Sequence, residues 1–327
     1  MRQPISVDFQ GGKVFAIGGS IYRQARDGPY GLIDAIHDHA MAFFGEAFID
    51  AEALKAIADR HPAVHWLLAT VERDEKVAAD KSDDPRARQT GAGAAWMRFA
   101  YDLFTIADNA ELQKRLRQRL LSARDYQGAR HELRVAAMCI AAGFALEFED
   151  ESDGSRTHPE FIAHDKQGVR IAVEAKSRHR HGVQGFSGGH AVDPGESVNT
   201  RKLVLESYRK KTDLPLYAFI DVNLPPRDEE GWLRWMHELN QLMADLSAEG
   251  YADQCAANAI LFFNDPSHYV GDGRIGFDHD KLWLRHFEAQ TPRKPHPAGV
   301  LERLLKAFAQ RRAPPPNFPD FRAEAET

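Results

Sequence analysis

Apolar residues recur along this chain with two different periods, and the change of period separates two regions. From about residue 30 to residue 121 they return every three or four positions, which is the spacing of one face of an α-helix. The first of these stripes consists of Leu32, Ile33, Ile36, Ala40, Phe43 and Phe44. We therefore predict a mainly helical N-terminal region at 1–121, which begins with a short β-hairpin at 5–23.

After residue 121 short apolar runs alternate with helical patterns. The predicted elements are, in order, helix 125–142, strands 144–148, 160–164 and 169–176, helix 196–211, strand 215–222, helix 231–248 and strand 259–263. The run at 215–222 is apolar at every position except Asp221, which is typical of a strand covered on both faces. This alternation indicates an α/β domain, which we place at 122–310. The tail at 311–327 is rich in proline and charge, and we expect it to be disordered.

The composition is that of a soluble protein with a sizeable core. Hydrophobic residues make up 43% of the 327 residues, and the mean hydropathy is -0.48. No apolar run approaches the length of a membrane span, and the N-terminus lacks the long apolar stretch of a secretory signal. Only two cysteines occur, Cys139 and Cys255, and both lie in apolar surroundings. This cysteine usage predicts reduced thiols and a cytoplasmic location.

Two histidines of the helical region, His61 and His65, have the spacing of a metal-binding pair on a helix. Pro62 lies between them, and no nearby carboxylate or cysteine completes a site. We therefore expect the histidines of this region to be exposed to solvent or to cap helices.

The predicted strand at 169–176 ends in charged residues, although residues 171–173 before them are apolar. Glu174 and Lys176 are two positions apart, so a strand points both side chains to the same face. The turn at 166–168 lets the preceding strand bring Glu160 beside them. Because buried charges are costly unless they pair or bind a metal, two carboxylates and an ammonium at this place indicate a functional site.

Metal-dependent phosphodiester hydrolysis is a reaction that this set of side chains suits. Mg²⁺ binds few protein carboxylates and keeps waters and substrate oxygens, a role for which Glu160 and Glu174 are suited. Lys176 would orient or activate the attacking water and oppose the phosphate charge. Glu132 lies on the predicted helix before the strands and borders its buried stripe, so it is a candidate to join them.

The order helix, three strands, helix, strand, with an acidic residue on the first helix, resembles the PD-(D/E)xK nuclease superfamily, also called the restriction-endonuclease-like fold. The resemblance covers 122–263 and is carried by Glu132, Pro159-Glu160 and Glu174-Ala175-Lys176. It implies an α-β-β-β-α-β core with a mixed central sheet, preceded by the helical N-terminal region. It also implies a nuclease dependent on Mg²⁺ (or Mn²⁺), with Glu160 and Glu174 as metal ligands, Glu132 as an auxiliary ligand and Lys176 at the attacking water.

The chain departs from this family at two places. The acid on the second strand is usually Asp, and here it is Glu160. Many exonuclease branches carry Gln-x-x-x-Tyr on the following helix, whereas this chain has Val204 four positions before Tyr208. The motif therefore gives no support for an exonuclease branch.

A basic segment follows the charged strand. Between residues 176 and 211 there are eight Lys or Arg and three Asp or Glu, although the whole chain has a net charge of -6. Such a local excess suits phosphate contact, and the candidate nucleic-acid-binding residues are Arg178, Arg180, Arg201 and Lys202. His179 and His181 are candidates for substrate contact or proton relay, with a solvated loop as the alternative.

Three functional hypotheses follow. The first is a Mg²⁺-dependent nuclease that acts on DNA. The second is a catalytically inactive protein of the nuclease fold that binds nucleic acid or a partner protein, and the third is a hydrolase of a small phosphoester. The sequence leaves open endonuclease against exonuclease, single against double strand, DNA against RNA, sequence preference, pathway and oligomeric state.

Overall fold

The computed structural model describes residues 5–9, 12–17, 20–23, 31–79, 90–110, 112–148, 159–186, 197–251, 257–271, 282–289 and 292–315. Near the N-terminus, the region in which we predicted a hairpin forms a three-stranded antiparallel sheet. Its strands are β1 (Ile5–Phe9), β2 (Gly12–Ile17) and β3 (Ser20–Arg23).

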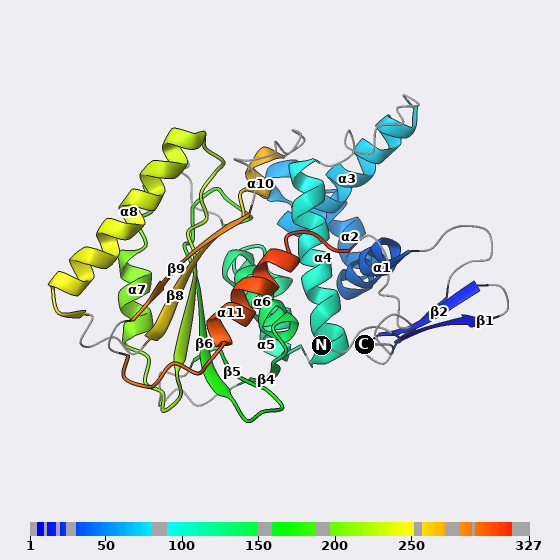
Figure 1. Cartoon of the computed structure of the whole chain (residues 1–327). Helices are drawn as coiled ribbons and strands as arrows, with labels where there is room; N and C mark the ends of the chain where they lie inside the picture. Colours follow the sequence, from blue (N-terminus) through cyan, green and yellow to red (C-terminus); the bar gives the residue numbers. More distant parts are fainter. Residues whose placement is uncertain are drawn as a thin grey trace.

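A group of helices follows, as the apolar periodicity predicts (Figure 1). These elements are α1 (Leu32–Phe44), α2 (Glu46–Ala53), the 3-10 turn η1 (Ile57–Asp59), α3 (Pro62–Ala79), α4 (Gly91–Asn109) and α5 (Lys114–Leu120). The Thr90 side chain caps α4 by accepting a hydrogen bond of 3.1 Å from the Gly93 N–H. A Cβ on Gly91 would lie 2.3 Å from the Ser267 carbonyl oxygen, so only glycine lets α4 approach α10 (Ser267–Val270) this closely.

The α/β class and the mixed central sheet are confirmed. After α6 (Tyr126–Ala141) the sheet is built in the order β4-β5-β6-β7-β8-β9. The remaining elements are β4 (Ala145–Phe148), β5 (Phe161–His164), β6 (Arg170–Ser177), α7 (Arg201–Tyr208), β7 (Leu216–Asp221), α8 (Glu229–Ala248), β8 (Ala257–Asn264), β9 (Trp283–Glu288) and α11 (Val300–Gln310). Strands β6, β7 and β8 are parallel to one another, and the other neighbours pair antiparallel.

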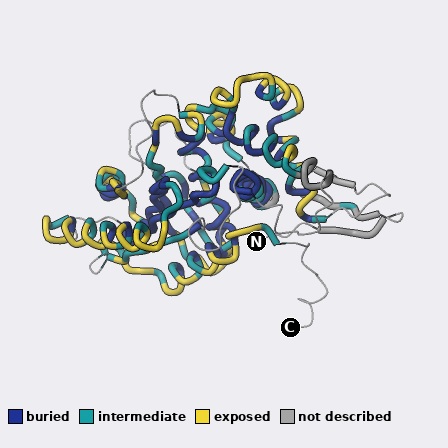
Figure 2. Tube along the Cα trace, turned by 90° about the horizontal axis from the view of Figure 1, so that it is seen from above, coloured by how far each residue is buried: buried dark blue, intermediate teal, exposed yellow. Residues whose placement is uncertain are grey.

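Helices cover both faces of this sheet, with α6 and α11 on one side and α7 and α8 on the other (Figure 1). Alternate residues of each strand enter different cores: Val173 and Phe219 face α6, whereas Ala172 and Ala218 face α7 and α8. This alternation decides where the charged residues of β6 point. Figure 2 shows the buried residues inside this layered arrangement and the exposed residues around its rim.

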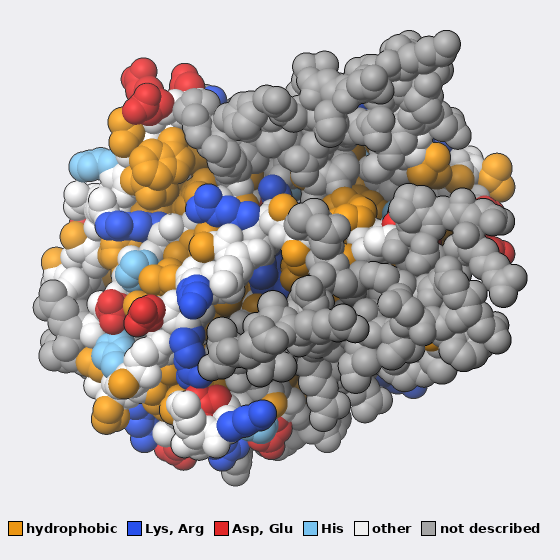
Figure 3. Space-filling model, turned by 45° about the vertical axis from the view of Figure 1, so that its right-hand side comes forward, with side chains coloured by type: hydrophobic (Ala, Val, Ile, Leu, Met, Phe, Trp, Pro, Cys, Tyr) orange, Lys and Arg blue, Asp and Glu red, His pale blue; other side chains and the backbone are white. Residues whose placement is uncertain are grey.

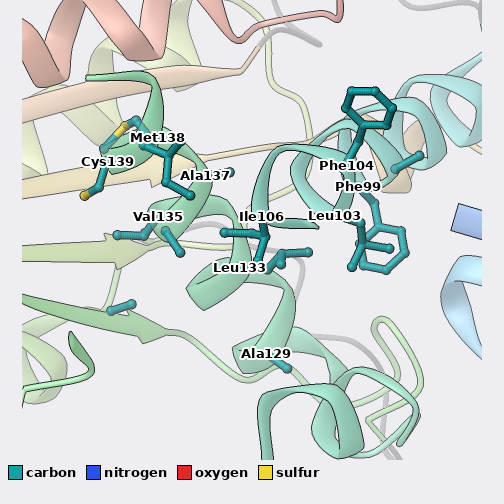
Figure 4. Packing of buried hydrophobic residues seen from close by; sticks show 14 of the residues in the cluster. Phe99, Leu103, Phe104, Ile106, Ala129, Leu133, Val135, Ala137, Met138 and Cys139 are labelled. Carbon is teal, nitrogen blue, oxygen red and sulfur yellow. The ribbon is translucent and has the colours of Figure 1, made fainter. Parts of the chain in front are cut away.

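The core on the α6 face extends into the helical region. Leu133 of α6 belongs to the same buried cluster as Phe99 and Leu103 of α4, and Figure 4 shows these side chains lying between the two helices. The sheet and the helices before it therefore share one hydrophobic core on this face.

A buried charge network reinforces the same junction. Asp265, which follows β8, accepts a hydrogen bond of 2.6 Å from Arg98 of α4 and one of 3.4 Å from Arg134 of α6. Asp102 of α4 accepts one of 2.7 Å from Arg311, at the end of α11. Burial raises the pKa of the Asp265 carboxyl, but the surrounding arginines outweigh burial and hold that pKa well below its usual range.

The structure also bears on the expected membrane and cysteine properties. Among the helices that it describes, none combines the length and the apolar character needed to cross a bilayer. Cys139 is a free, buried cysteine of α6, and burial raises the pKa of its thiol. Cys255 lies outside the described residues.

The expectation that the N-terminal histidines are solvated or cap helices is wrong for His61. Its residue surface is 1% exposed, and its ring lies 4.8 Å from the Tyr126 ring and 5.5 Å from the Phe44 ring, centroid to centroid. Burial lowers the pKa of His61 from 6.5 to about 4. A histidine in a sequence pattern can belong to an aromatic core as readily as to the surface.

We expect acid to destabilise the fold through His61. The unfolded chain takes up a proton near pH 6.5, but the folded chain does so only near pH 4, so stability is present above 6.5 and is lost as the pH falls through this window. Between pH 7 and pH 5 the loss from this residue is about 2 kcal/mol. Urea unfolding at the two pH values measures it, and His61→Phe should reduce the difference by that amount. An unchanged difference would contradict the assignment.

We also expect Asp265→Asn to lower the free energy of unfolding by about 3 to 5 kcal/mol, because it removes one of the two anions among buried arginines. Urea titration at pH 7 measures the loss. Asp245→Asn, at an exposed position of α8, is the matched control and should stay within about 0.5 kcal/mol of the original protein. Similar effects of the two substitutions would show that the network does not stabilise the junction.

Candidate functional site

The C-terminal half of strand β6 carries two charged residues on one face, as its period of two requires. Glu174 and Lys176 share the face of Ala172, which packs toward α7 and α8. The Glu174 side chain is fully buried, and its Oε1 lies 2.7 Å from Nζ of Lys176, whose side chain is 25% exposed. The charged end of the strand therefore has a buried anion next to a partly accessible cation.

Glu160 joins this pair from the neighbouring strand. It directly precedes β5, whose Phe161 lies opposite Val173 of β6 in the antiparallel register. The backbone N–H of Glu160 donates a hydrogen bond of 2.9 Å to the Val173 carbonyl oxygen. Its Oε1 lies 3.2 Å from Nζ of Lys176, so one ammonium contacts both carboxylates. The structure thus brings together the three side chains for which the sequence predicts convergence.

A fourth charged residue completes the cluster, and sequence reasoning did not single it out. Lys210 follows α7, and its Nζ lies 3.1 Å from Oε1 of Glu174. In the sequence it is one of the eight basic residues between 176 and 211. One feature of the sequence could have indicated it: Lys210 lies two residues after Tyr208, at the end of a helix that packs against β6 and β7. Sequence alone could not tell which of the adjacent Arg209, Lys210 and Lys211 turns inward.

The electrostatics of this cluster, which we call the Glu174 cluster (Glu160, Glu174, Lys176 and Lys210), are those of buried ion pairs. Burial raises the pKa of Glu174, while the Lys176 and Lys210 ammonium groups oppose that rise. Burial alone would lower the pKa of Lys176, but the Glu174 and Glu160 carboxylates outweigh it and raise that pKa. Lys176 is therefore a protonated donor at neutral pH. Neither carboxylate oxygen of Glu174 accepts a hydrogen bond of good geometry, despite the short distances to nitrogen.

Glu132 lies apart from this cluster, which corrects the predicted set of three carboxylates. It sits on α6, the helix that covers the other face of the sheet, and its Oε2 accepts a hydrogen bond of 2.6 Å from Arg119 of α5. Within the described ranges, no three His, Cys, Asp or Glu side chains are grouped so that they could hold a metal ion. Only Glu160 and Glu174 among the predicted ligands lie together.

The predicted nucleic-acid contacts have different environments. The Arg178 guanidinium donates to the Ser197 and Val198 carbonyl oxygens at 2.9 and 3.3 Å, which orders the start of the segment leading to α7. Arg201 is ion-paired with Glu249. Lys202 is 88% exposed and is directed to solvent.

Arg180 does not face solvent as a phosphate contact would. It is 4% exposed, and its Nη1 donates 2.8 Å to the Tyr269 hydroxyl and 3.2 Å to the Asn223 carbonyl oxygen. Arg180 is therefore part of the interior that joins the end of β6 to the segments after β7 and β8. The sequence pattern of alternating basic residues did not distinguish it from its neighbour Arg178.

The two histidines of the same segment lie against an aromatic ring. His179 and His181 are exposed, and their rings lie 5.2 and 4.8 Å from the Phe186 ring, centroid to centroid. Burial of part of its ring lowers the pKa of His179, and the Arg119 guanidinium acts in the same direction. Figure 3 shows Lys and Arg side chains recurring between hydrophobic side chains on one face of the molecule.

Comparisons of the chain with protein-family models, with curated proteins and with solved structures find no match. The chemistry of the Glu174 cluster is therefore the basis for assigning a function. Its composition is two carboxylates for cation or proton binding and two ammonium groups for anion binding.

We expect strong coupling between Glu174 and Lys176 in a double-mutant cycle. Glu174→Gln should lower the free energy of unfolding by about 3 kcal/mol or more, because it leaves two ammonium groups without their central anion. Adding Lys176→Met should recover part of that loss, giving a coupling energy of about 1 kcal/mol or more in urea titrations.

The exposed pair of Glu147 and Arg170, 3.2 Å apart, is the matched control for this cycle. Glu147→Gln and Arg170→Met should couple by less than about 1 kcal/mol, since solvent screens this pair. Additivity of the Glu174 and Lys176 substitutions within about 0.5 kcal/mol would contradict the proposed charge balance.

Proposed function

We propose that this protein is a nuclease that hydrolyses phosphodiester bonds of DNA with the help of Mg²⁺ (or Mn²⁺). The observation that carries the proposal is the Lys176 ammonium, which contacts the carboxylates of Glu160 and Glu174 on adjacent strands at 3.2 and 2.7 Å. Phosphodiester hydrolysis needs a positioned water, neutralisation of the phosphate and stabilisation of the leaving oxygen. These residues supply the ligands and the cation for those tasks.

The two carboxylates fit a hard divalent cation. Both oxygens of Glu174 are buried without a hydrogen bond of good geometry, and Glu160 keeps 17% of its side chain exposed, which gives solvent access. Glu160 and Glu174 would hold the ion, which prefers few protein oxygens plus water and phosphate oxygens. When bound, such an ion acts as a Lewis acid and lowers the pKa of a bound water.

Lys176 has the role of a donor in this proposal. Because the neighbouring carboxylates raise its pKa, its ammonium is protonated at neutral pH while those carboxylates hold no metal ion. Its ammonium can hold the attacking water by a hydrogen bond and oppose the charge that develops on the phosphate. Orienting the water is one of the two roles that the sequence suggests for Lys176, the other being its activation.

The arrangement of elements supports the same proposal by analogy of fold. The order α6-β4-β5-β6-α7-β7 and the mixed sheet are those implied by the resemblance to the PD-(D/E)xK superfamily. Lys202, on the first turn of α7, is directed to solvent on the helix that leads to Lys210 and is suited to contact the DNA backbone. A cytoplasmic location belongs to this proposal and rests on the buried free thiol of Cys139.

The purified protein should cut DNA in the presence of Mg²⁺ or Mn²⁺, and EDTA should stop the cleavage. Glu174→Ala and Lys176→Ala should each lower the rate by about 100-fold or more, since each removes a group that contacts the reacting atoms. Plasmid, linear duplex and single-stranded oligonucleotides, resolved on gels, provide the measurement and separate endonuclease from exonuclease action.

Glu147→Ala is the matched control for this assay, because it removes an exposed glutamate from another strand of the same sheet. Its rate should equal that of the original protein. Failure to cut any DNA or RNA substrate while nucleic acid still binds would favour the alternative, an inactive protein of the nuclease fold that binds nucleic acid or a partner protein.

A further inference from the structure

The four charges of the Glu174 cluster sum to zero. Glu160 and Glu174 contribute two negative charges, and Lys176 and Lys210 contribute two positive charges. Both ammonium groups lie on the same oxygen, Oε1 of Glu174, at 2.7 and 3.1 Å. A pair of carboxylates attracts a divalent cation through its excess negative charge, and here that excess is already neutralised within the protein.

The fold places the backbone of Lys210 within reach of this oxygen. Val204 and Tyr208 of α7 pack into the core on the same sheet face as Ala172. The backbone N–H of Lys210 then donates 3.2 Å to the Ser207 carbonyl oxygen, which extends the end of the helix toward the cluster. Only 16% of the Lys210 side chain is exposed, so its ammonium lies in a partly desolvated place where charge interactions are strong.

The two lysines differ in how they are attached. Lys176 contacts both carboxylates and belongs to β6 itself, so its position is tied to the pairing of β5 with β6. Lys210 approaches Glu174 from outside the sheet, at the end of α7. It can therefore turn away from Glu174 while Glu160 and Glu174 stay side by side.

We propose that Lys210 is a positioning residue that makes divalent-metal binding depend on the nucleic acid, because it neutralises Glu174 in the free protein and transfers to a phosphate oxygen when the substrate arrives. The inference rests on the proposed nuclease function. A phosphodiester adds one negative charge, which gives the Lys210 ammonium a second partner and frees the carboxylate for the metal ion. Metal ion and phosphate then bind together, each raising the affinity for the other by the same factor.

The test is direct Mn²⁺ binding by calorimetry, with and without a phosphorothioate duplex that resists cleavage. The original protein should bind Mn²⁺ about 10-fold or more tightly when the duplex is present, within the usual range of coupling between sites. In the absence of the duplex, the Lys210→Met variant should bind Mn²⁺ about 10-fold more tightly than the original protein. Adding the duplex should then raise the Mn²⁺ affinity of this variant by less than about 3-fold.

Lys211→Met is the matched control, since it removes the same charge from the next, exposed position. It should bind Mn²⁺ as the original protein does, both with and without the duplex. Lys210→Gln tests the same point with a polar side chain, and a single cooperative urea transition for each variant shows that the fold is kept, although loss of the ion pair should lower its midpoint.

The outcomes separate the two proposals. Suppose that the original protein binds Mn²⁺ and that both Lys210 variants bind it equally well or more weakly. The role of Lys210 is then overturned, and the nuclease proposal stands. If the original protein binds no Mn²⁺ with or without the duplex and cuts no DNA, the nuclease proposal fails and this inference fails with it. If the two Lys210 variants bind Mn²⁺ more tightly than the original protein and Lys211→Met does not, the result supports the inference.

Discussion

A negative charge buried in a central strand is the constraint on which the candidate site depends. The Glu174 carboxylate is withdrawn from water, and an isolated charge in such a place would be very costly. Two ammonium groups offset that cost, one from the same strand and one from the end of α7. Their distances to the carboxylate require that the β5–β6 pair and α7 keep their places relative to each other, so the ion pairs couple the sheet to the helix that covers it.

Buried carboxylates are paired with cations also where the helical region meets the sheet, but there the charges are less accessible to solvent. There the carboxylates of Asp102 and Asp265 lie among arginines that are 12% exposed or less, and the network closes the interior between α4, α6 and α11. In the Glu174 cluster, Lys176 and Glu160 keep 25% and 17% of their side chains exposed. The Glu174 cluster is therefore open to solvent, whereas the network of Asp102 and Asp265 is largely closed to it. For this reason we propose chemistry at the Glu174 cluster and a structural role for the network.

The two faces of the sheet also divide the candidate residues. Strand alternation sends Glu174 and Lys176 to the face of α7, whereas Glu132 belongs to α6 on the other face and pairs with Arg119. The chemistry of the proposed nuclease then relies on two carboxylates and two lysines. A cluster of balanced charge differs from three acids around one metal ion, because its two lysines already neutralise the two carboxylates.

The sequence by itself determined the features that depend on local spacing. Periods of three to four and of two predicted most of the helices and strands up to β8, but not β9 or α11, and the two-residue separation of Glu174 and Lys176 predicted their common face. A short turn between β5 and β6 was enough to predict that Glu160 comes beside them. Tertiary structure decided the rest. Lys210 enters the cluster, Glu132 stays outside it, and Arg180 and His61 are buried. Each of these depends on which face of a helix or loop packs against elements distant in the chain, and a sequence pattern records only distances along the chain.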